Sequence, residues 1–222
     1  MLPSPHLVRD TLAPRALVPL LPGVAGRGPR RHADGRERLY LTLDDGPDPD
    51  GTPRLLDALA RHGAQATMFL SGPAARAHPA LVRDIVAAGH TVGSHGWAHR
   101  SAWRWGADLD GHDRAQALLE DLTGAPLVGV RPPYGRVTPA LLRWAHRRGL
   151  PVVLWDLMPG DFLASATAEG VAAALRRYRR PGGIAVLHDG APAARAAAAL
   201  DLALPAMPGV AFPALSRTDL RP

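Results

Sequence analysis

The stretch LYLTLDDGPD, residues 39–48, carries the strongest fold signal in the chain. An apolar run ends in two adjacent aspartates, Asp44 and Asp45, and a Gly-Pro turn follows directly. This pattern predicts a buried strand that stops at the turn. Because neighbouring strand residues point to opposite sides, the two carboxylates can do different work. One can bind a metal ion while the other accepts a proton.

Strand and helix signals alternate outward from this stretch along the 222-residue chain. Alternation implies parallel strands joined by helical crossovers. We therefore predict an α/β fold, a distorted (β/α) barrel of about seven parallel strands. The rival fold is an open doubly wound sheet. It is disfavoured because no Gly-rich phosphate loop follows the first expected strand of this sequence. The expected strands are 39–43, 66–70, 91–93, 127–130, 151–154, 184–187 and an edge strand 210–212; the expected helices are 53–62 and 138–148 with N-caps Thr52 and Thr138, and 79–88, 108–122, 168–178 and 191–204.

Composition limits the chemistry and the domain count. The chain has no cysteine, so a metal ion would need His, Asp or Glu ligands, which suit zinc, cobalt, nickel or manganese. One domain, 39–222, is expected after an N-terminal helix or loop extension, 1–38, that packs on it. The net charge of +6 comes from scattered arginines, which favours a solvated surface and no nucleic-acid partner.

The apolar stretch 12–24 is interrupted by prolines and resembles no clear signal peptide. No segment has the length of a membrane span. A monomer is expected, cytoplasmic by default, with the cell envelope as the alternative.

Polar residues follow the carboxyl ends of the expected strands. In α/β barrels that face holds the active site, so these side chains are expected to gather in one place. They are Asp44, Asp45, His95, His99, Arg131, Asp156, Asp161 and His188.

His95 and His99 lie four residues apart, a spacing that suits a single metal ion. With Asp45 they give two nitrogens and one oxygen. Three protein ligands leave one position open for water or substrate, as in catalytic zinc sites.

The segment RPPYG, residues 131–135, is a stiff loop in which two prolines fix φ. Arg131 can orient a carboxylate, and the backbone N–H of Tyr134 can face a developing oxyanion. His188 ends an apolar strand and can donate a proton to a leaving group. The plainer alternatives are a structural proline turn with a surface arginine, and a histidine bonded to a backbone carbonyl.

Four segments together resemble the polysaccharide deacetylases with a NodB-like domain, carbohydrate esterase family four. The segments are Thr42 to Pro47, His95 to His99, Arg131 to Gly135, and Leu187 to Asp189. The resemblance implies a NodB-like deacetylase domain over 39–222 and one divalent metal ion, most often zinc. It also implies an acetylated glycan as substrate: chitin, chitooligosaccharide or peptidoglycan through N-acetyl groups, or xylan through O-acetyl groups.

The resemblance also implies a role for each matching residue. Asp45, His95 and His99 are expected to bind the metal, with Asp44 as general base and His188 as general acid. Tyr134 would donate its backbone N–H to the oxyanion, and Arg131 would hold Asp44. Pro133, Trp97 and Leu187 are expected to contact the substrate; Trp103 and Trp105 also lie near the histidine motif, as stacking or packing residues.

Three positions depart from the family pattern. Gly96 stands where Ser or Thr is usual, Met158 replaces a frequent Asp, and Phe162 replaces a frequent Trp. The acidic partner of His188 is therefore expected to be Asp161, with Asp156 as the second choice. Two other functions stay open: hydrolysis of a small amide or cyclic imide on the same fold, and a catalytically weak carbohydrate-binding homologue.

Overall fold

The structure is a computed structural model that describes residues 8–220. The strands are β1 (Val24–Ala25), β2 (Glu37–Asp44), β3 (Ala66–Leu70), β4 (Thr91–Ser94), β5 (Val152–Val153), β6 (Gly183–His188) and β7 (Val210–Ala211). The α-helices are α2 (Ala13–Leu17), α3 (Gly51–Arg61), α4 (Gly72–Ala77), α5 (Pro79–Ala87), α6 (Ala102–Trp105), α7 (Leu109–Thr123), α8 (Pro139–Arg147), α9 (Ala168–Tyr178) and α10 (Ala193–Ala203). Three short helical turns complete the described elements: η1 (Val8–Leu12), η2 (Val18–Leu20) and η3 (Pro133–Gly135).

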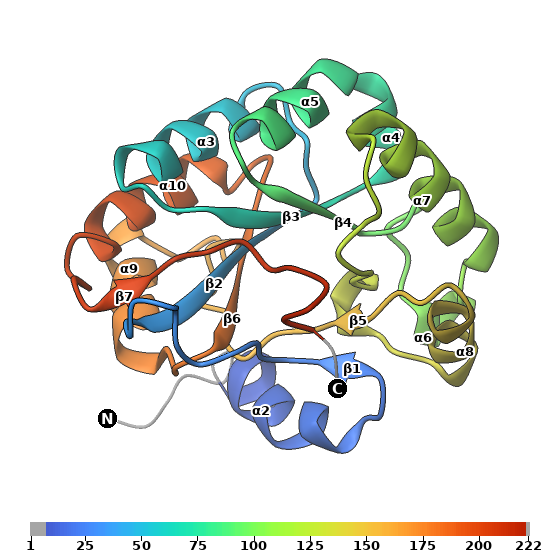
Figure 1. Ribbon diagram of the computed structural model, residues 1–222, viewed down its shortest axis with the longest axis horizontal. Helices are drawn as coiled ribbons and strands as arrows, with labels where there is room; N and C mark the ends of the chain where they lie inside the picture. Colours follow the sequence, from blue (N-terminus) through green and yellow to red (C-terminus); the bar gives the residue numbers. More distant parts are fainter. Residues whose placement is uncertain (1–7, 221–222) are drawn as a thin grey trace.

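The strands form a distorted, incompletely closed barrel, as the sequence predicts. The main sheet has the order β4-β3-β2-β6, β7 pairs with β2, and β1 pairs with β5, all in parallel. Helices α3, α5 and α10 lie together along one side, with α7 and α8 farther round (Figure 1). The rest of the barrel wall is joined by isolated β-bridges. They pair Ser94 with Val130, Val130 with Val152, and Leu157 with Ala185.

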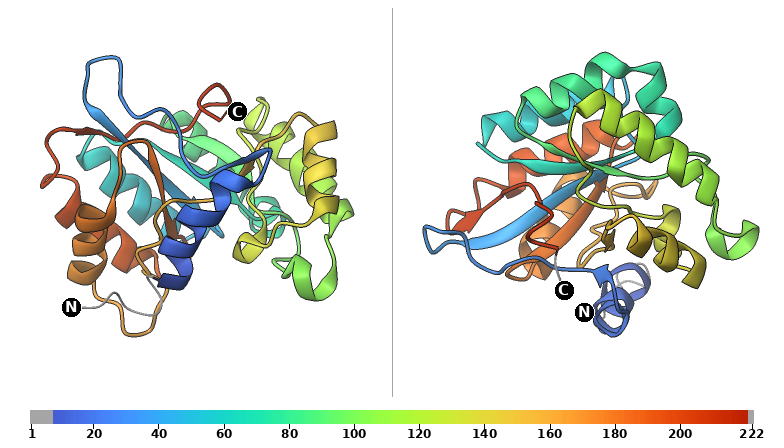
Figure 2. Two further views of the ribbon diagram at one scale, coloured as in Figure 1. Left: turned by 90° about the horizontal axis from the view of Figure 1, so that it is seen from below. Right: turned by 45° about the vertical axis from the view of Figure 1, so that its right-hand side comes forward.

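Strand β2 is the centre of this arrangement. Its residues 39–44 are buried, and it pairs with both β3 and β6. A strand covered on both faces needs a near-continuous apolar run rather than strict alternation, and LYLTL supplies one. Because the strands are parallel, the carboxyl ends of β2, β4 and β6 lie at one edge of the sheet. Figure 2 shows the fold from two further directions.

Several predicted boundaries are confirmed. Helix α9 has the predicted limits, and β7 forms within the predicted edge strand. Thr138 caps α8, because its hydroxyl accepts a hydrogen bond from the Leu141 N–H at 3.2 Å. Pro139 follows at the first helical position, where a missing N–H costs nothing.

Other expectations are wrong. Thr52 is not an N-cap: α3 begins at Gly51, and the Thr52 hydroxyl donates to the Asp189 carboxylate from inside the helix. The expected strand 127–130 is reduced to bridges at Val130, because its short run between Gly124 and two prolines leaves little backbone to pair. Strand β1 and the short helices α4 and α6 were not predicted, since each is too short to show a periodic pattern.

The N-terminal segment lies against the chain just after β5. The Trp155 indole N–H donates to the carbonyl of Asp10 at 2.7 Å, and the Met158 N–H donates to the Thr11 hydroxyl at 3.1 Å. Val18 is buried in the smaller of the two hydrophobic clusters. The division of the chain near residue 38 stays a prediction, and residues 1–7 of the expected extension lie outside the described part. Within residues 8–220, no helix combines the length and apolar character that crossing a membrane requires.

Candidate metal centre and active site

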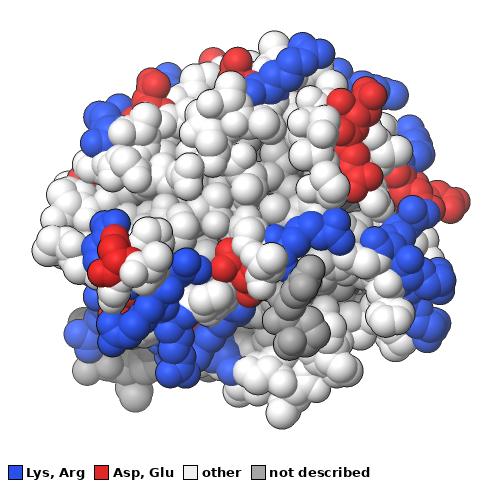
Figure 3. Space-filling view, viewed as in Figure 1, with Lys and Arg blue, Asp and Glu red and all other residues white. Residues whose placement is uncertain are grey.

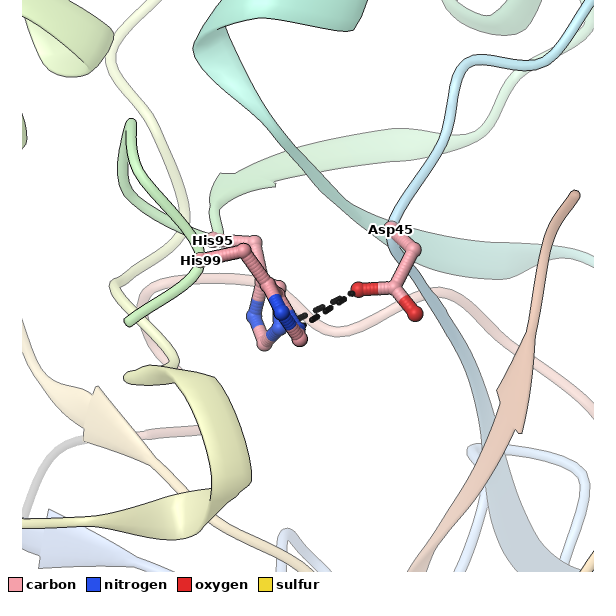
Figure 4. A group of neighbouring side chains, drawn as sticks. All are labelled: Asp45, His95 and His99. Atoms are coloured by element: carbon pink, nitrogen blue, oxygen red, sulfur yellow. Dashed lines mark ion pairs between the residues drawn. The ribbon is translucent and has the colours of Figure 1, made fainter. Parts of the chain in front are cut away.

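Asp45, His95 and His99 come together at the edge where β2 and β4 end (Figure 4). The Asp45 Oδ1 lies 3.4 Å from Nε2 of His95 and 3.2 Å from Nε2 of His99. The candidate ligand atoms all lie within 4.8 Å of one another. Two imidazole nitrogens and a carboxylate oxygen thus face a common point, which is the donor set of a catalytic metal site with an open position.

The charge states also suit a cation. Burial acts to raise the pKa of Asp45, but the hydrogen bond with His99 and the nearby histidine charges outweigh it and lower the pKa to about 2. Burial lowers the pKa of His95, which keeps that imidazole neutral. The pKa of His99 is raised by its hydrogen bond to Asp45, so a proton and a metal ion compete for the same side chains. The residues present therefore fit a divalent metal ion.

The backbone is strained at this place. Among residues 8–220, the non-glycine residues with positive φ are Asp45 at 77°, His99 at 43° and Tyr134 at 58°. Side chains disfavour this region, and each such residue costs on the order of 1–3 kcal/mol unless its surroundings hold it. All three belong to the predicted site, and strain of this kind gathers at functional sites.

Asp44 is held by a fully buried arginine. The Arg131 Nη1 donates to Asp44 Oδ1 at 2.6 Å and to the Thr42 hydroxyl at 2.8 Å. Its other nitrogens donate to the carbonyls of Val153 and Leu154, both at 3.1 Å. Each of the three guanidinium nitrogens therefore donates to an oxygen, which fixes the Asp44 carboxylate in place.

His188 lies beside Asp44, because the two residues are register partners in β6 and β2. Its Nδ1 is 3.0 Å from Asp161 Oδ1, and its backbone N–H donates to Asp161 Oδ2 at 2.7 Å. Burial acts to lower the pKa of His188, but the hydrogen bond with Asp161 and the charges of Asp161, Asp44 and Asp45 outweigh burial and raise it.

Of the two acidic candidates, the structure therefore brings Asp161 to His188 and not Asp156. Asp156 lies in ion pairs with Arg15 at 3.1 Å and Arg27 at 2.8 Å. The second choice is wrong because residue 156 still lies on the barrel wall beside β6. The chain must run five residues further before it reaches the edge with His188.

The loop with Tyr134 borders the metal-ligand cluster. The Tyr134 ring lies 4.9 Å from the His99 ring, and a Cβ at Gly135 would collide with the Trp155 ring. Pro133 is buried, and Leu187 has no exposed surface. Contacts of Pro133 and Leu187 with substrate, and the use of the Tyr134 N–H, stay predictions.

Trp97 packs inside the fold. A Cβ at Gly72 would collide with its ring, and the Arg114 guanidinium lies 4.0 Å from the ring centroid. The indole is half-buried, so a contact with substrate stays a prediction. Trp103 and Trp105 are more open, with 66% and 67% of their surfaces exposed.

Sequence reasoning gave no role to two residues that the structure places at the site. The Phe162 ring meets the His188 ring edge-on at 5.0 Å. Asp189 is buried against Gly46 and Gly51, and burial raises its pKa. The sequence signal for Asp189 was the glycine at positions 46 and 51, because a side chain at either position would occupy the space of the Asp189 carboxylate.

The departure at Gly96 has a structural explanation. Gly96 has φ of +80°, and a Cβ there would lie 3.0 Å from Cε1 of His112. His112 is buried in that space, and burial lowers its pKa to about 4. A neutral imidazole from α7 thus occupies the room beside the histidine motif.

A parallel α/β barrel with an Asp-His-His cluster and two acid–base pairs at the carboxyl edge of its strands has the layout of a hydrolase active site. A sequence model of the family "Polysaccharide deacetylase" matches residues 31–153. The chain is 34% identical to a chitooligosaccharide deacetylase of Sinorhizobium fredii over 73% of this chain and 76% of that protein. It is 30% identical to a peptidoglycan-N-acetylglucosamine deacetylase of Bacillus cereus, over 69% of this chain and 56% of the relative.

Solved structures agree. A peptidoglycan N-acetylglucosamine deacetylase superposes with a TM-score of 0.80 at 29% identity, covering 87% of this chain and 91% of the other. A family 4 carbohydrate esterase from Streptomyces lividans, in complex with acetate, gives 0.76 at 31% identity, with coverages of 83% and 96%. The chain belongs to the polysaccharide deacetylase family.

Proposed function

We propose that this protein is a metal-dependent hydrolase that removes acetyl groups from a glycan containing N-acetylglucosamine, such as peptidoglycan or a chitooligosaccharide. One observation carries the proposal. The Asp45, His95 and His99 donor atoms lie within 4.8 Å of one another, next to the Asp44–Arg131 and His188–Asp161 pairs. A carboxylate base, an imidazole acid and a cation site at one edge are the parts that acyl hydrolysis needs.

Asp45, His95 and His99 would hold one divalent ion. Zinc accepts this donor set, and cobalt, nickel and manganese are the alternatives. When bound, the ion polarises the acetyl carbonyl and makes a coordinated water more acidic. The low pKa of Asp45 and the neutral state of His95 supply ligands that are already deprotonated.

Asp44 takes the proton of the attacking water. Arg131 keeps the Asp44 carboxylate oriented through its hydrogen bond. As the water oxygen bonds to the acetyl carbon, the carbonyl oxygen gains negative charge, and the Tyr134 backbone N–H would donate a hydrogen bond to it.

His188 completes the reaction as general acid. Its Nδ1 is engaged by Asp161, which leaves Nε2 to give a proton to the departing nitrogen. The carbon–nitrogen bond then breaks, and acetate and a free amine leave. An O-acetyl group follows the same route, with an alcohol in place of the amine.

The relatives support this substrate class. The Sinorhizobium relative is named for chitooligosaccharides and the Bacillus relative for peptidoglycan. The Streptomyces esterase structure contains acetate, the acid that the proposed reaction releases.

Acetate release from chitooligosaccharides, peptidoglycan fragments and acetylxylan, with and without chelator, tests the proposal. We expect release from N-acetylated glycans that chelator abolishes. Asp44→Asn should reduce the rate on the order of a hundred- to ten-thousand-fold. Full turnover by Asp44→Asn would contradict its role, and a metal-free protein that opens a cyclic imide but leaves glycans intact would replace the proposal with the small-substrate alternative.

A further inference from the structure

Exposed aromatic side chains lie on the segments that carry or follow the predicted site residues. Trp103, Trp105, Tyr134 and Phe162 have 66%, 67%, 58% and 39% of their surfaces exposed. Tyr134 and Phe162 contact His99 and His188. Large apolar side chains that stay open beside a polar site mark a place where a ligand lies. Trp103 and Trp105 lie outside the acetyl site itself and need their own explanation.

Trp103 is open to solvent but fixed in position. Its indole N–H donates to the carbonyl of Val137 at 3.0 Å. The Arg136 guanidinium lies 4.2 Å from the ring centroid. The hydrogen bond holds the edge of the Trp103 ring and Arg136 covers one of its faces. The rest of the ring stays exposed to solvent, where a sugar ring can stack on it. The short α6 thus places an aromatic plane at a defined spot.

Two chain segments connect this platform to the metal-ligand cluster. Arg136 and Tyr134 belong to the same loop, two residues apart, and the Tyr134 ring lies 4.9 Å from the His99 ring. On the second segment, Trp103 lies four residues after His99 in the sequence. Tyr134 thus connects the metal-ligand cluster to Arg136, and Arg136 in turn lies over the Trp103 ring.

The platform carries positive charge without compensation. Within residues 8–220, no ion pair to a carboxylate forms at Arg100, Arg104 or Arg136. Figure 3 shows basic side chains at the lower right of the molecule, where Figure 1 draws α6 and α8, with acidic side chains above them. A guanidinium with free donors binds a carboxylate through two parallel hydrogen bonds.

We propose that Trp103 and Arg136 form a subsite for a neighbouring sugar that carries a carboxylate. The apolar face of the sugar ring would stack on Trp103, and the carboxylate would pair with Arg136. This inference rests on the proposed function and narrows it. It favours a glycan in which acid-bearing sugars alternate with N-acetylglucosamine over a neutral chitin-like chain.

The test compares two disaccharides that differ only in charge. The first is N-acetylglucosamine joined to N-acetylmuramic acid, and the second is the same disaccharide with its lactyl carboxylate reduced to an alcohol. Binding to the full chain is measured by calorimetry with chelator present, so that hydrolysis does not interfere. We expect about tenfold tighter binding of the charged disaccharide, the size of one partly exposed charge-assisted hydrogen-bonded pair.

Arg136→Gln should remove this preference and leave binding of the reduced disaccharide unchanged, whereas Trp103→Ala should weaken both. The matched control is Arg177→Gln, which removes the charge of an arginine placed 5.6 Å from the Tyr178 ring on α9; it should change neither affinity. Equal binding of both disaccharides, or a preference that survives Arg136→Gln, overturns the subsite. An equal loss of the preference for the charged disaccharide in Arg177→Gln also overturns the subsite. Acetate release without chelator is measured separately: its absence on every glycan contradicts the proposed function, while the binding data still decide the subsite.

Discussion

The carboxylate of Asp161 holds His188 at two points. One oxygen lies 3.0 Å from the ring Nδ1, and the other accepts the backbone N–H of the same residue at 2.7 Å. Asp161 has no exposed surface, so solvent does not screen the interaction. The ring orientation and its proton affinity therefore depend on one buried side chain.

Asp161→Asn should shift the pH dependence of activity. The carboxylate raises the pKa of His188, and a general acid works only while protonated. Loss of the charge lowers that pKa, so the high-pH limb of the kcat profile should move to lower pH. For the same reason, the contribution of this pair to stability is full below the ordinary histidine pKa of about 6.5 and is lost as pH rises through the raised value.

Acetate release measured across pH checks this shift. Asp57→Asn, on the exposed face of α3, is the control that removes a distant carboxylate. A basic limb that stays in place in Asp161→Asn would show that Asp161 does not set the proton affinity of His188.

Removal of the ligands should remove the metal. Asp45→Ala leaves two imidazoles without the carboxylate that both contact. We expect the metal content per protein, measured by elemental analysis after dialysis, to fall from near one to near zero. Undiminished metal content in Asp45→Ala would mean that the ion binds elsewhere.

The loss of activity on chelation should be reversible. Wild-type protein treated with chelator should lose acetate release and regain it when zinc or cobalt is added back, because the ligands stay in place without the ion. Chelated protein that keeps its full rate would contradict a metal-dependent reaction.

Arg131→Met should destabilise the fold as well as the site. It would leave Asp44, which is 4% exposed, without its buried partner. Breaking a buried ion pair in this way costs about 3–5 kcal/mol in the free energy of unfolding. Urea denaturation measures the loss. The double variant Asp44→Asn with Arg131→Met should lose less than the sum of the single changes; strict additivity would mean that the two residues act independently.

Restoring the usual family residue at position 96 should be harmful here. Gly96→Ser places a side chain on a backbone with φ of +80° and about 3.0 Å from the His112 ring. The backbone strain alone costs on the order of 1–3 kcal/mol, which a thermal melt would detect. A serine variant as stable as the wild type would show that the loop relaxes without cost.

The sequence was informative where a pattern repeats or a motif is complete. The apolar run before Asp44 predicted β2, and four motifs at strand ends predicted which side chains meet. It was uninformative for contacts that depend on tertiary geometry. The sequence placed Asp161 ahead of Asp156 as the partner of His188, and the structure agrees, but no local pattern encodes the reason, which is that the barrel wall ends between these two residues. The burial of Trp97 follows from close packing against Gly72, and the space beside Gly96 depends on α7, sixteen residues along the chain.

The contacts of the first twenty described residues affect how the protein can be shortened. The family match begins at residue 31, so trimming to that boundary looks harmless from alignment alone. Such a cut would delete Arg15 and Arg27 and leave the buried carboxylate of Asp156 with neither guanidinium. It would also uncover Trp155, whose ring abuts the Gly135 turn. Expression and crystallisation efforts should therefore retain the amino-terminal residues from at least Asp10 onward.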